Sequence, residues 1–236
     1  MTSKANEAAR LLSEANASGR KLPALPPELQ PASIEEAYAV QHAWPRKAPI
    51  YGWKVGPGAT PDGLCAAPLL GIAALASPAD VPFSEGLGIE VEVTVTLGAD
   101  NAIASLHMSY ELFQSRYADR TQVGFASVLA DHLNNAGIVV GPAATAEVPL
   151  ETLEVVLTED GVEIARTATG MSLDETKTNI AWLAKHAAKH GAPLAAGTVI
   201  LTGARLGPIG IKPGSRYVAT SPLGAVELFV SPPPRR

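Results

Sequence analysis

The chain has 236 residues, an apolar fraction of 47% and a formal net charge of −5 at pH 7. This length suits one large domain, or one domain with a small appendage. The mild negative charge and the lack of any basic block make nucleic acid and acidic membranes poor partners. Cys65 carries the only thiol, so no disulfide can form within the chain.

The first residues lack the apolar run of a signal peptide, so we expect a cytoplasmic protein. The longest apolar stretch, residues 66–81, is broken by prolines, a glycine and an aspartate and cannot span a bilayer. Apolar residues at helical spacing predict a helix over residues 4–18. Ser33 and Glu36 then form a capping box for a second helix that ends before Pro45. We therefore expect a small N-terminal helical region, residues 1–48, packed on the remaining chain.

A short strand is predicted over residues 51–56, and a loop rich in proline and glycine follows it. Lys54 lies in this strand between the apolar Trp53 and Val55. Two interpretations stay open. The lysine lies at the surface of an edge strand, or it points into a pocket, where it holds an anion or shares charge with an acid.

Residues 86–98 show the clearest pattern in the chain. Apolar residues alternate with Glu90, Glu92 and two threonines, which predicts a β-strand with one apolar face. Both carboxylates then project from the other face, with Cα atoms roughly 7 Å apart. Two acids this close repel each other unless both are solvated or a cation lies between them. Glu111 is the candidate for a third acid at such a cation site.

The later residues predict a mixture of helices and short strands. A long helix is expected within residues 110–136, and a buried strand over residues 138–141 follows it. Next come a hairpin around residues 159–161, a helix over residues 172–191 with a capping box, and a strand over residues 199–203. Many short strands separated by turns favour an α+β fold with a coiled or barrel-like β core and helices outside it.

Four motifs stand in order along the chain: Gly52-Trp-Lys-Val-Gly56, Ile89-Glu-Val-Glu-Val93, Tyr110-Glu-Leu-Phe-Gln-Ser-Arg116, and Asp131-His-Leu-Asn-Asn-Ala-Gly-Ile-Val-Val-Gly141. In this order they resemble the fumarylacetoacetate hydrolase superfamily, and more closely its 2-keto-4-pentenoate hydratase and 4-oxalocrotonate decarboxylase branch. The resemblance covers nearly the whole chain. It implies a mixed, highly coiled β-sheet roll with peripheral helices, which would form a catalytic domain over residues 49–232.

The resemblance also implies a site. A divalent ion, Mg²⁺ or Mn²⁺, would be held by three carboxylates, those of Glu90, Glu92 and Glu111. Such hard cations prefer carboxylate oxygens. Lys54 would be the catalytic lysine of the substrate pocket. Further contacts to the substrate are expected from five positions, which are Gly56, Arg116, Asn134, Thr202 and Gly203.

The activity that the resemblance implies is hydration of a short 2-hydroxy-dienoate or 2-oxo-enoate, such as 2-hydroxypenta-2,4-dienoate. The metal would act as a Lewis acid for the enolate that forms on the 2-oxygen. Three alternatives stay open: decarboxylation of an oxalocrotonate-type 2-oxo-3-enedioate, C–C hydrolysis at the same metal site, or a non-catalytic accessory subunit. The resemblance further implies a homo-oligomer, and complexes between related hydratases and decarboxylases.

Several positions depart from the branch. Leu69 stands where the branch has an acid that is thought to move protons. Asn134 and Asn135 replace small serines, and Ala204-Arg205 stands in place of another serine. Four residues could replace the lost acid or base, although each is more often a surface or loop residue: Asp62, His107, Asp131 and His132.

Overall fold

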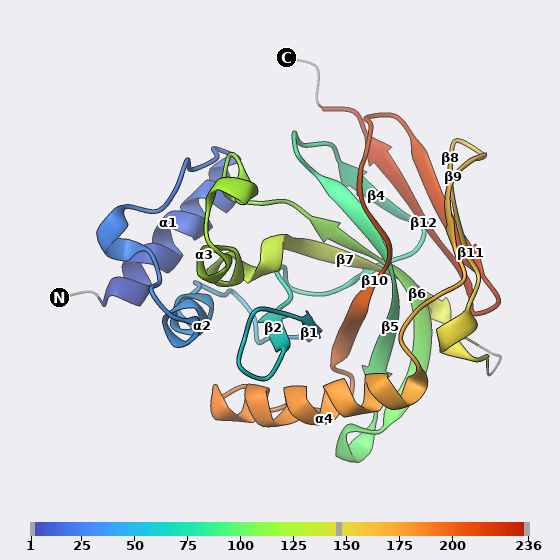
Figure 1. The fold of residues 1–236 in the computed structure, drawn as a ribbon. Helices are drawn as coiled ribbons and strands as arrows, with labels where there is room; N and C mark the ends of the chain where they lie inside the picture. Colours follow the sequence, from blue (N-terminus) through green and yellow to red (C-terminus); the bar gives the residue numbers. More distant parts are fainter. Residues whose placement is uncertain (1–2, 145–147, 234–236) are drawn as a thin grey trace.

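The computed structural model describes residues 3–144 and 148–233 and contains two mixed β-sheets (Figure 1). The strands of the first sheet are β1 (Gly52–Pro57), β2 (Leu64–Pro68), β3 (Leu75–Ala76), β5 (Gly88–Leu97), β6 (Ile103–Phe113), β7 (Asn135–Ala143) and β10 (Val199–Gly210). Those of the second sheet are β4 (Ala79–Pro82), β8 (Val155–Glu159), β9 (Val162–Thr167), β11 (Arg216–Ser221) and β12 (Gly224–Ser231). The orders are β2-β1-β10-β5-β6-β7-β3 and β4-β12-β11-β8-β9. The predicted α+β class with a mixed β-roll is confirmed.

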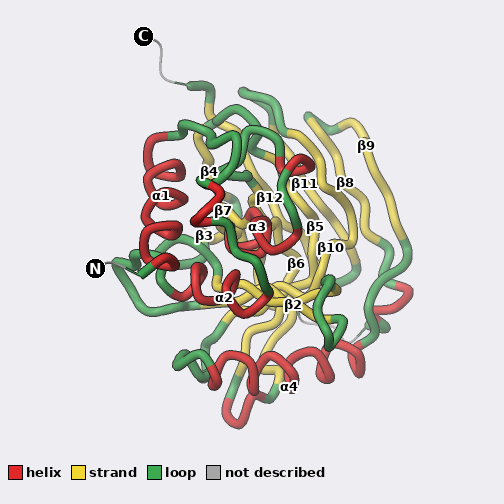
Figure 2. The backbone as a smooth tube through the Cα atoms, turned by 60° about the vertical axis from the view of Figure 1, so that its left-hand side comes forward, coloured by secondary structure: helices red, strands yellow, loops and turns green. Residues whose placement is uncertain are grey.

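Four α-helices surround the sheets in the described part of the chain: α1 (Lys4–Ser18), α2 (Ile34–His42), α3 (Phe125–Ala130) and α4 (Leu173–Lys189). Helices α1, α2 and α3 gather on one side of the molecule, and α4 runs along another side (Figures 1 and 2). None of the helices in residues 3–144 and 148–233 has the length and apolar character that crossing a bilayer requires.

The capping residues begin two of these helices much as the sequence predicts. Before α4, Ser172 and Glu175 form a complete capping box. Before α2, the Ser33 hydroxyl accepts a hydrogen bond from the Glu36 amide at 3.2 Å. The Glu36 carboxylate, however, accepts from the amide of Ala32 at 2.9 Å, so only half of the predicted box forms there.

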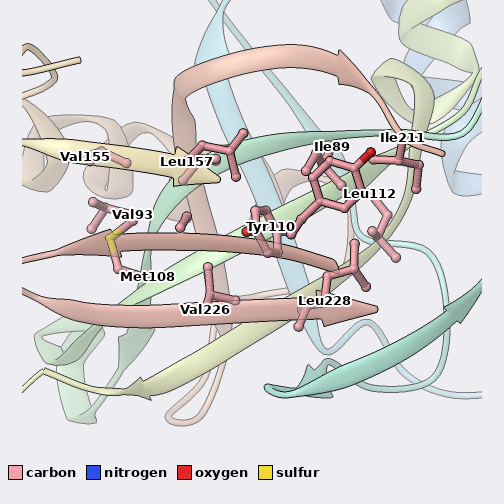
Figure 3. Close-up of a cluster of buried hydrophobic side chains, with 14 of the residues drawn as sticks. Ile89, Val93, Met108, Tyr110, Leu112, Val155, Leu157, Ile211, Val226 and Leu228 are labelled. Carbon is pink, nitrogen blue, oxygen red and sulfur yellow. The ribbon is translucent and has the colours of Figure 1, made fainter. Parts of the chain in front are cut away.

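The main hydrophobic core lies between the two sheets. Alternation along β5 directs Ile89, Val91 and Val93 to this interior, where all three side chains are buried. Figure 3 shows residues of β5 and β6 meeting Leu157 of β8 and Leu228 of β12. The strand therefore has the apolar face that its sequence pattern predicts.

Helix α4 packs on the first sheet through a second cluster. Trp53 of β1, Val95 of β5 and Ile200 of β10 meet Ile180 and Leu183 of α4. Lys54 directly follows Trp53 in β1. Because side chains alternate along a strand, Lys54 projects from the face opposite α4. A third cluster joins α1 and α2 to α3 and β2.

The long helix predicted within residues 110–136 is wrong. Residues up to Phe113 belong to β6, and the helical part is only α3. Tyr110 and Leu112 point into the core between the sheets, which is a period of two rather than a helical period. After α3, residues 132–134 all have positive φ angles, from 52° to 61°, and this turn ends the helical segment.

Two histidines at the helix layers should make stability depend on pH. Burial, and secondarily the nearby His190, lowers the pKa of His42 in α2 and of His186 in α4 to about 4. The unfolded chain, with histidine pKa values near about 6.5, binds more protons in the intervening range. The free energy of unfolding should therefore fall as the pH drops from about 6.5 to 4, by up to about 1.4 kcal/mol per pH unit for each histidine.

Urea denaturation between pH 7.5 and pH 4.5 measures this effect. His42→Gln should reduce the steepness of the decline, because the variant loses one of the groups that take up a proton on unfolding. An equally steep decline in His42→Gln would contradict the assignment of the effect to this side chain.

Candidate active site

Three carboxylates converge on one face of the first sheet. Glu90 and Glu92 project from β5, and Glu111 of β6 lies directly opposite Glu90 in the antiparallel pairing. One carboxylate oxygen from each residue lies within 4.8 Å of the other two. Glu92 and Glu111 are 1% and 0% exposed, so the interpretation of these acids as a solvated strand face is wrong.

The electrostatics of this cluster favour a cation. Burial, and then the charge of Glu111, raises the pKa of Glu92 above its ordinary value. Burial also raises the pKa of Glu90, against the opposing charge of Lys54. Both shifts mean that the folded protein disfavours the ionised form of these two acids, and a cation bound between the carboxylates would offset that cost. Clustered carboxylate oxygens are the donor set that Mg²⁺, Mn²⁺ and Ca²⁺ prefer, so the residues present fit a hard divalent ion.

Lys54 lies in the site and not at the surface. Its side chain is 17% exposed, and Nζ donates to both carboxylate oxygens of Glu111 at 2.7 and 2.6 Å. Burial alone would lower the pKa of Lys54, but the charges of Glu111, Glu92 and Glu90 outweigh it, and the pKa lies above its ordinary value. The lysine is therefore a permanent cation beside the carboxylates at neutral pH.

A backbone group of β10 also orients one of the acids. The amide of Gly203 donates to Oε2 of Glu92 at 2.8 Å. Gly203 has φ of +116° and lies where the pairing of β10 with β5 shifts between Leu201 and Ala204. This conformation suits glycine because side chains with a Cβ rarely adopt it. The irregularity in β10 thus aims an N–H group at the site.

Asn135, at the start of β7, orients Glu111. Its Nδ2 donates to Oε1 of Glu111 at 2.9 Å, and its Oδ1 accepts from the amide of Leu70 at 2.8 Å. The side chain is fully buried, so both ends of the amide are fixed. The sequence marked Asn135 only as a departure from the branch, and its contact with Glu111 follows from the pairing of β6 with β7.

Asn135→Ser should lower the affinity for Mn²⁺ by about 10- to 100-fold, the scale expected when a partner that orients a metal ligand is lost. Serine is too short to keep both hydrogen bonds. Isothermal titration calorimetry measures the change, with Asn134→Ser as the matched control. Asn134 is also buried, but its Oδ1 has no hydrogen-bond partner among the described residues. Equal losses in the two variants would contradict an orienting role for Asn135.

A cavity of about 220 Å³ opens beside the three acids. Lys54, Glu90 and Glu92 line one part of it. The remaining wall is apolar or main chain: Val55, Gly56, Pro57, Cys65, Phe125, Leu133, Gly203 and Ala204. Burial raises the pKa of the Cys65 thiol to about 11, so this wall stays uncharged at neutral pH. Gly56 and Gly203 line the cavity, and their contact with a substrate stays a prediction. Phe125, Leu133 and Cys65 are lining residues that the sequence did not indicate.

The structure does not bring Arg116 to this cavity. Arg116 is 1% exposed, and its guanidinium donates to the Asp131 carboxylate, to the Asp131 carbonyl at 2.5 Å and to the Asn135 carbonyl at 2.7 Å. These bonds hold the turn that leads into β7. The predicted substrate contact of Arg116 is therefore replaced by a structural role. Thr202 is 3% exposed and its hydroxyl donates to the Val93 carbonyl at 2.7 Å, so its substrate contact stays a prediction.

The four candidates for a replacement proton carrier all have other partners. Asp131 pairs with Arg116, and Asp62 accepts from the Trp182 indole at 3.1 Å. The Nδ1 atoms of His132 and His107 lie 3.0 and 2.9 Å from the carbonyl oxygens of Pro68 and Gly141. None of the four is among the described residues that line the cavity. Leu69 is 3% exposed and packs in the core, so its position offers no acid either.

Comparisons with known proteins give relatives in sequence, although no protein-family model matches the chain. A 4-oxalocrotonate decarboxylase of a Pseudomonas species is 30% identical over 129 residues, which are 54% of this chain and 50% of the relative. A 2-keto-4-pentenoate hydratase of Burkholderia vietnamiensis is 30% identical over 146 residues, which are 56% of this chain and 55% of the relative. The chain thus spans about half the length of the curated relatives it matches.

Solved structures extend the likeness in fold. A 4-oxalocrotonate decarboxylase from Pseudomonas putida, complexed with magnesium and adipate, has a TM-score of 0.78 at 22% identity and covers 96% of this chain and 97% of its own. The resemblance to the hydratase and decarboxylase branch is confirmed. A 2-hydroxyhepta-2,4-diene-1,7-dioate isomerase from Mycobacterium marinum is similar at a TM-score of 0.58 and 17% identity, over 79% of this chain and 76% of its own. A protein that is named as an isomerase therefore has a similar fold.

Proposed function

We propose that this protein is a metal-dependent hydratase that adds water to a short 2-hydroxy-dienoate or 2-oxo-enoate, such as 2-hydroxypenta-2,4-dienoate. One observation carries the proposal: three carboxylates lie together beside one small cavity, and two of them line it with Lys54. The curated relatives named hydratase support the same activity. The likeness to a decarboxylase supports the alternative, decarboxylation at the same site.

Glu90, Glu92 and Glu111 would hold the divalent ion of this enzyme. Magnesium is present in the structure of the decarboxylase of similar fold, and Mg²⁺ or Mn²⁺ suits the all-carboxylate donor set here. When bound, such an ion supplies a Lewis acid that stabilises the negative charge developing on the 2-oxygen of the substrate. Asn135 and the Gly203 amide keep two of the three carboxylates in fixed orientations for this task.

Lys54 would neutralise the substrate carboxylate or the negative charge that develops on the enolate. Its ammonium lies in the cavity wall and stays protonated because the surrounding acids raise its pKa. Phe125 and Leu133 form the apolar part of the wall and limit the number of water molecules near the charges. Fewer water molecules strengthen the attraction between Lys54 and an anionic substrate.

The size and charge of the cavity favour a small monocarboxylate. At about 220 Å³ it lies below the range of about 300 to 1,000 Å³ that holds drug-sized ligands. A dicarboxylate needs a second cation for its far end, and Lys54 is the only cationic side chain among the described residues that line the cavity. The small cavity and its single cation therefore support our preference for hydration of a monocarboxylate over decarboxylation of a 2-oxo-3-enedioate.

Turnover assays test the proposal. The purified protein is mixed with 2-hydroxypenta-2,4-dienoate, and loss of the conjugated diene is followed by ultraviolet absorbance with Mg²⁺, with Mn²⁺ and with a chelator. Hydration that requires the ion is the expected result. Release of CO₂ from an oxalocrotonate-type substrate, without hydration of the dienoate, would identify the decarboxylase. Inactivity in both assays would favour the accessory-subunit alternative.

We also propose that the protein assembles as a homo-oligomer, since closed symmetric assemblies are the common outcome for soluble enzymes. Light scattering at micromolar protein concentration gives the mass directly. Mixing with a related decarboxylase or hydratase in the same measurement tests for the hetero-complex that the resemblance implies.

A further inference from the structure

Three histidines meet between α2 and α4, away from the carboxylate cavity. His186 and His190 stand four residues apart on α4, and His42 is the last residue of α2. One ring nitrogen from each histidine lies within 4.8 Å of the other two. The His186 ring is 6.0 Å from the ring of Trp53, which projects from β1 on the face opposite Lys54. The cluster and the candidate active site therefore lie on different sides of β1.

Two of these imidazoles have unused nitrogens in the interior. The Nε2 atoms of His42 and His186 are buried and have no hydrogen-bond partner among the described residues. Buried polar atoms in native proteins nearly always have a partner, which can be a residue, an ordered water or an ion. A neutral imidazole has one ring nitrogen with a lone pair, and a metal ion is a partner that this lone pair can take.

We propose that His42, His186 and His190 bind a transition-metal ion of the Zn²⁺ class. Neutral imidazole nitrogens are ligands that Zn²⁺, Ni²⁺ and Cu²⁺ prefer, whereas Mg²⁺ prefers oxygen. Two histidines at i and i+4 on one helix face are a recurrent arrangement for zinc. A third histidine from another element completes the three-nitrogen set, and a water molecule takes the fourth tetrahedral position.

Ring rotation is the movement that binding requires. The rings of His42 and His190 are stacked, with centroids 4.3 Å apart and planes 7° apart. A metal ion lies in the plane of each imidazole that ligates it, so two rings that are stacked face to face cannot both bind it. Turning one ring about its Cβ–Cγ bond removes this obstacle, since that torsion is broad for histidine. Rotation also brings the nitrogens toward the separation of about 3.4 Å that zinc–nitrogen bonds of about 2.0 to 2.1 Å imply.

The ion would join two parts of the fold. Helix α2 belongs to the N-terminal helical region, whereas α4 packs on the first sheet against β1, β5 and β10. A metal held by both helices would fasten this region to the β-roll. Because a ligand that binds only the folded state stabilises it, Zn²⁺ should raise the melting temperature.

Calorimetry with Zn²⁺ tests this site. The intact protein is titrated in millimolar Mg²⁺, which occupies oxygen sites and not imidazole sites. His190→Gln and His42→Gln should each lower the Zn²⁺ affinity by about 100-fold or more, since losing a ligand costs at least as much as losing a partner of a ligand. His107→Gln is the matched control: its ring lies on β6 with Thr96 and Ser105, and its removal should leave the affinity unchanged.

A spectroscopic readout locates the ion independently. The rings of Trp182 and His186 are stacked at 5.1 Å, so Cu²⁺ at the cluster should quench tryptophan fluorescence in the wild type and not in His190→Gln. Circular dichroism without metal verifies that each variant folds, and the two variants alter different helices. Unchanged Zn²⁺ affinity in both folded variants would overturn the proposal. So would Zn²⁺ binding that Glu92→Gln abolishes and His190→Gln leaves intact, since the ion would then lie at the carboxylates.

Discussion

Glu92→Gln should weaken Mn²⁺ binding by about 100-fold or more and abolish metal-dependent turnover. Glu92 is 1% exposed and its carboxylate oxygens lie with those of Glu90 and Glu111, so the substitution removes one of three charges from a buried site. Loss of a partner that merely orients a ligand already costs about 10- to 100-fold. Glutamine keeps the shape and can still accept from the Gly203 amide, so the fold should persist.

Isothermal titration calorimetry with Mn²⁺ measures this loss, and circular dichroism monitors the fold. Glu163→Gln serves as the control, because Glu163 lies exposed on β9 and pairs with Arg166. It removes the same charge from the protein without touching the cluster. If Glu90→Gln, Glu92→Gln and Glu111→Gln all kept wild-type affinity, the carboxylate cluster could not be a metal site.

Lys54→Ala should lower kcat by about 10²-fold or more, the scale of losing one electrostatic stabiliser of a developing charge. The affinity for Mn²⁺ should not fall. Nζ of Lys54 lies 2.6 Å from the Glu111 carboxylate, so removing its positive charge makes the carboxylates more attractive to a cation. Activity and metal binding should thus change independently, which distinguishes this variant from Glu92→Gln.

Steady-state kinetics beside Mn²⁺ titration of the same variant checks the result. Lys54→Arg should restore activity only in part, because the larger planar guanidinium places its charge differently. Near-wild-type turnover in Lys54→Ala would contradict a catalytic role. Neither Arg116 nor Arg205 offers an easy substitute, because Arg205 donates to the carbonyls of Leu150 and Met171 at 2.5 and 3.0 Å and Arg116 is buried against Asp131.

The sequence predicted the parts of the site that local patterns determine. Strict alternation from Ile89 to Leu97 identified β5 and placed Glu90 and Glu92 on one face. The order of the four motifs identified Glu111 and Lys54 as further site residues. This identification rests on the resemblance to a known family, which can be seen in the sequence without knowing the fold. The solvated-face alternative was wrong because sequence alternation distinguishes two faces but does not say that other parts of the chain, such as Lys54, Asn135 and Gly203, cover the second one.

Contacts between residues that are far apart in the sequence could not be predicted from local sequence patterns. Lys54 and Glu111 are 57 positions apart, and β10 and β5 separate their strands in the sheet, so only the three-dimensional structure shows that the two side chains touch. The error over residues 110–136 has the same origin, because helical spacing near α3 was extended into a segment whose partners lie in β5 and β7. Arg116 was predicted to contact the substrate, whereas its guanidinium pairs with Asp131, which lies further along the chain.

The parallel pairing of β1 with β10 also has a consequence for synthesis on the ribosome. Gly52, Trp53 and Lys54 align with Val199, Ile200 and Leu201, so an early strand reaches its neighbour only when most of the chain has been made. Until then β1 has just β2 beside it in the sheet, and one of its edges stays open. Such delayed long-range pairing slows folding and leaves nascent chains prone to aggregation. Expression at reduced temperature should therefore raise the soluble yield of this protein more than that of a helical bundle of similar length.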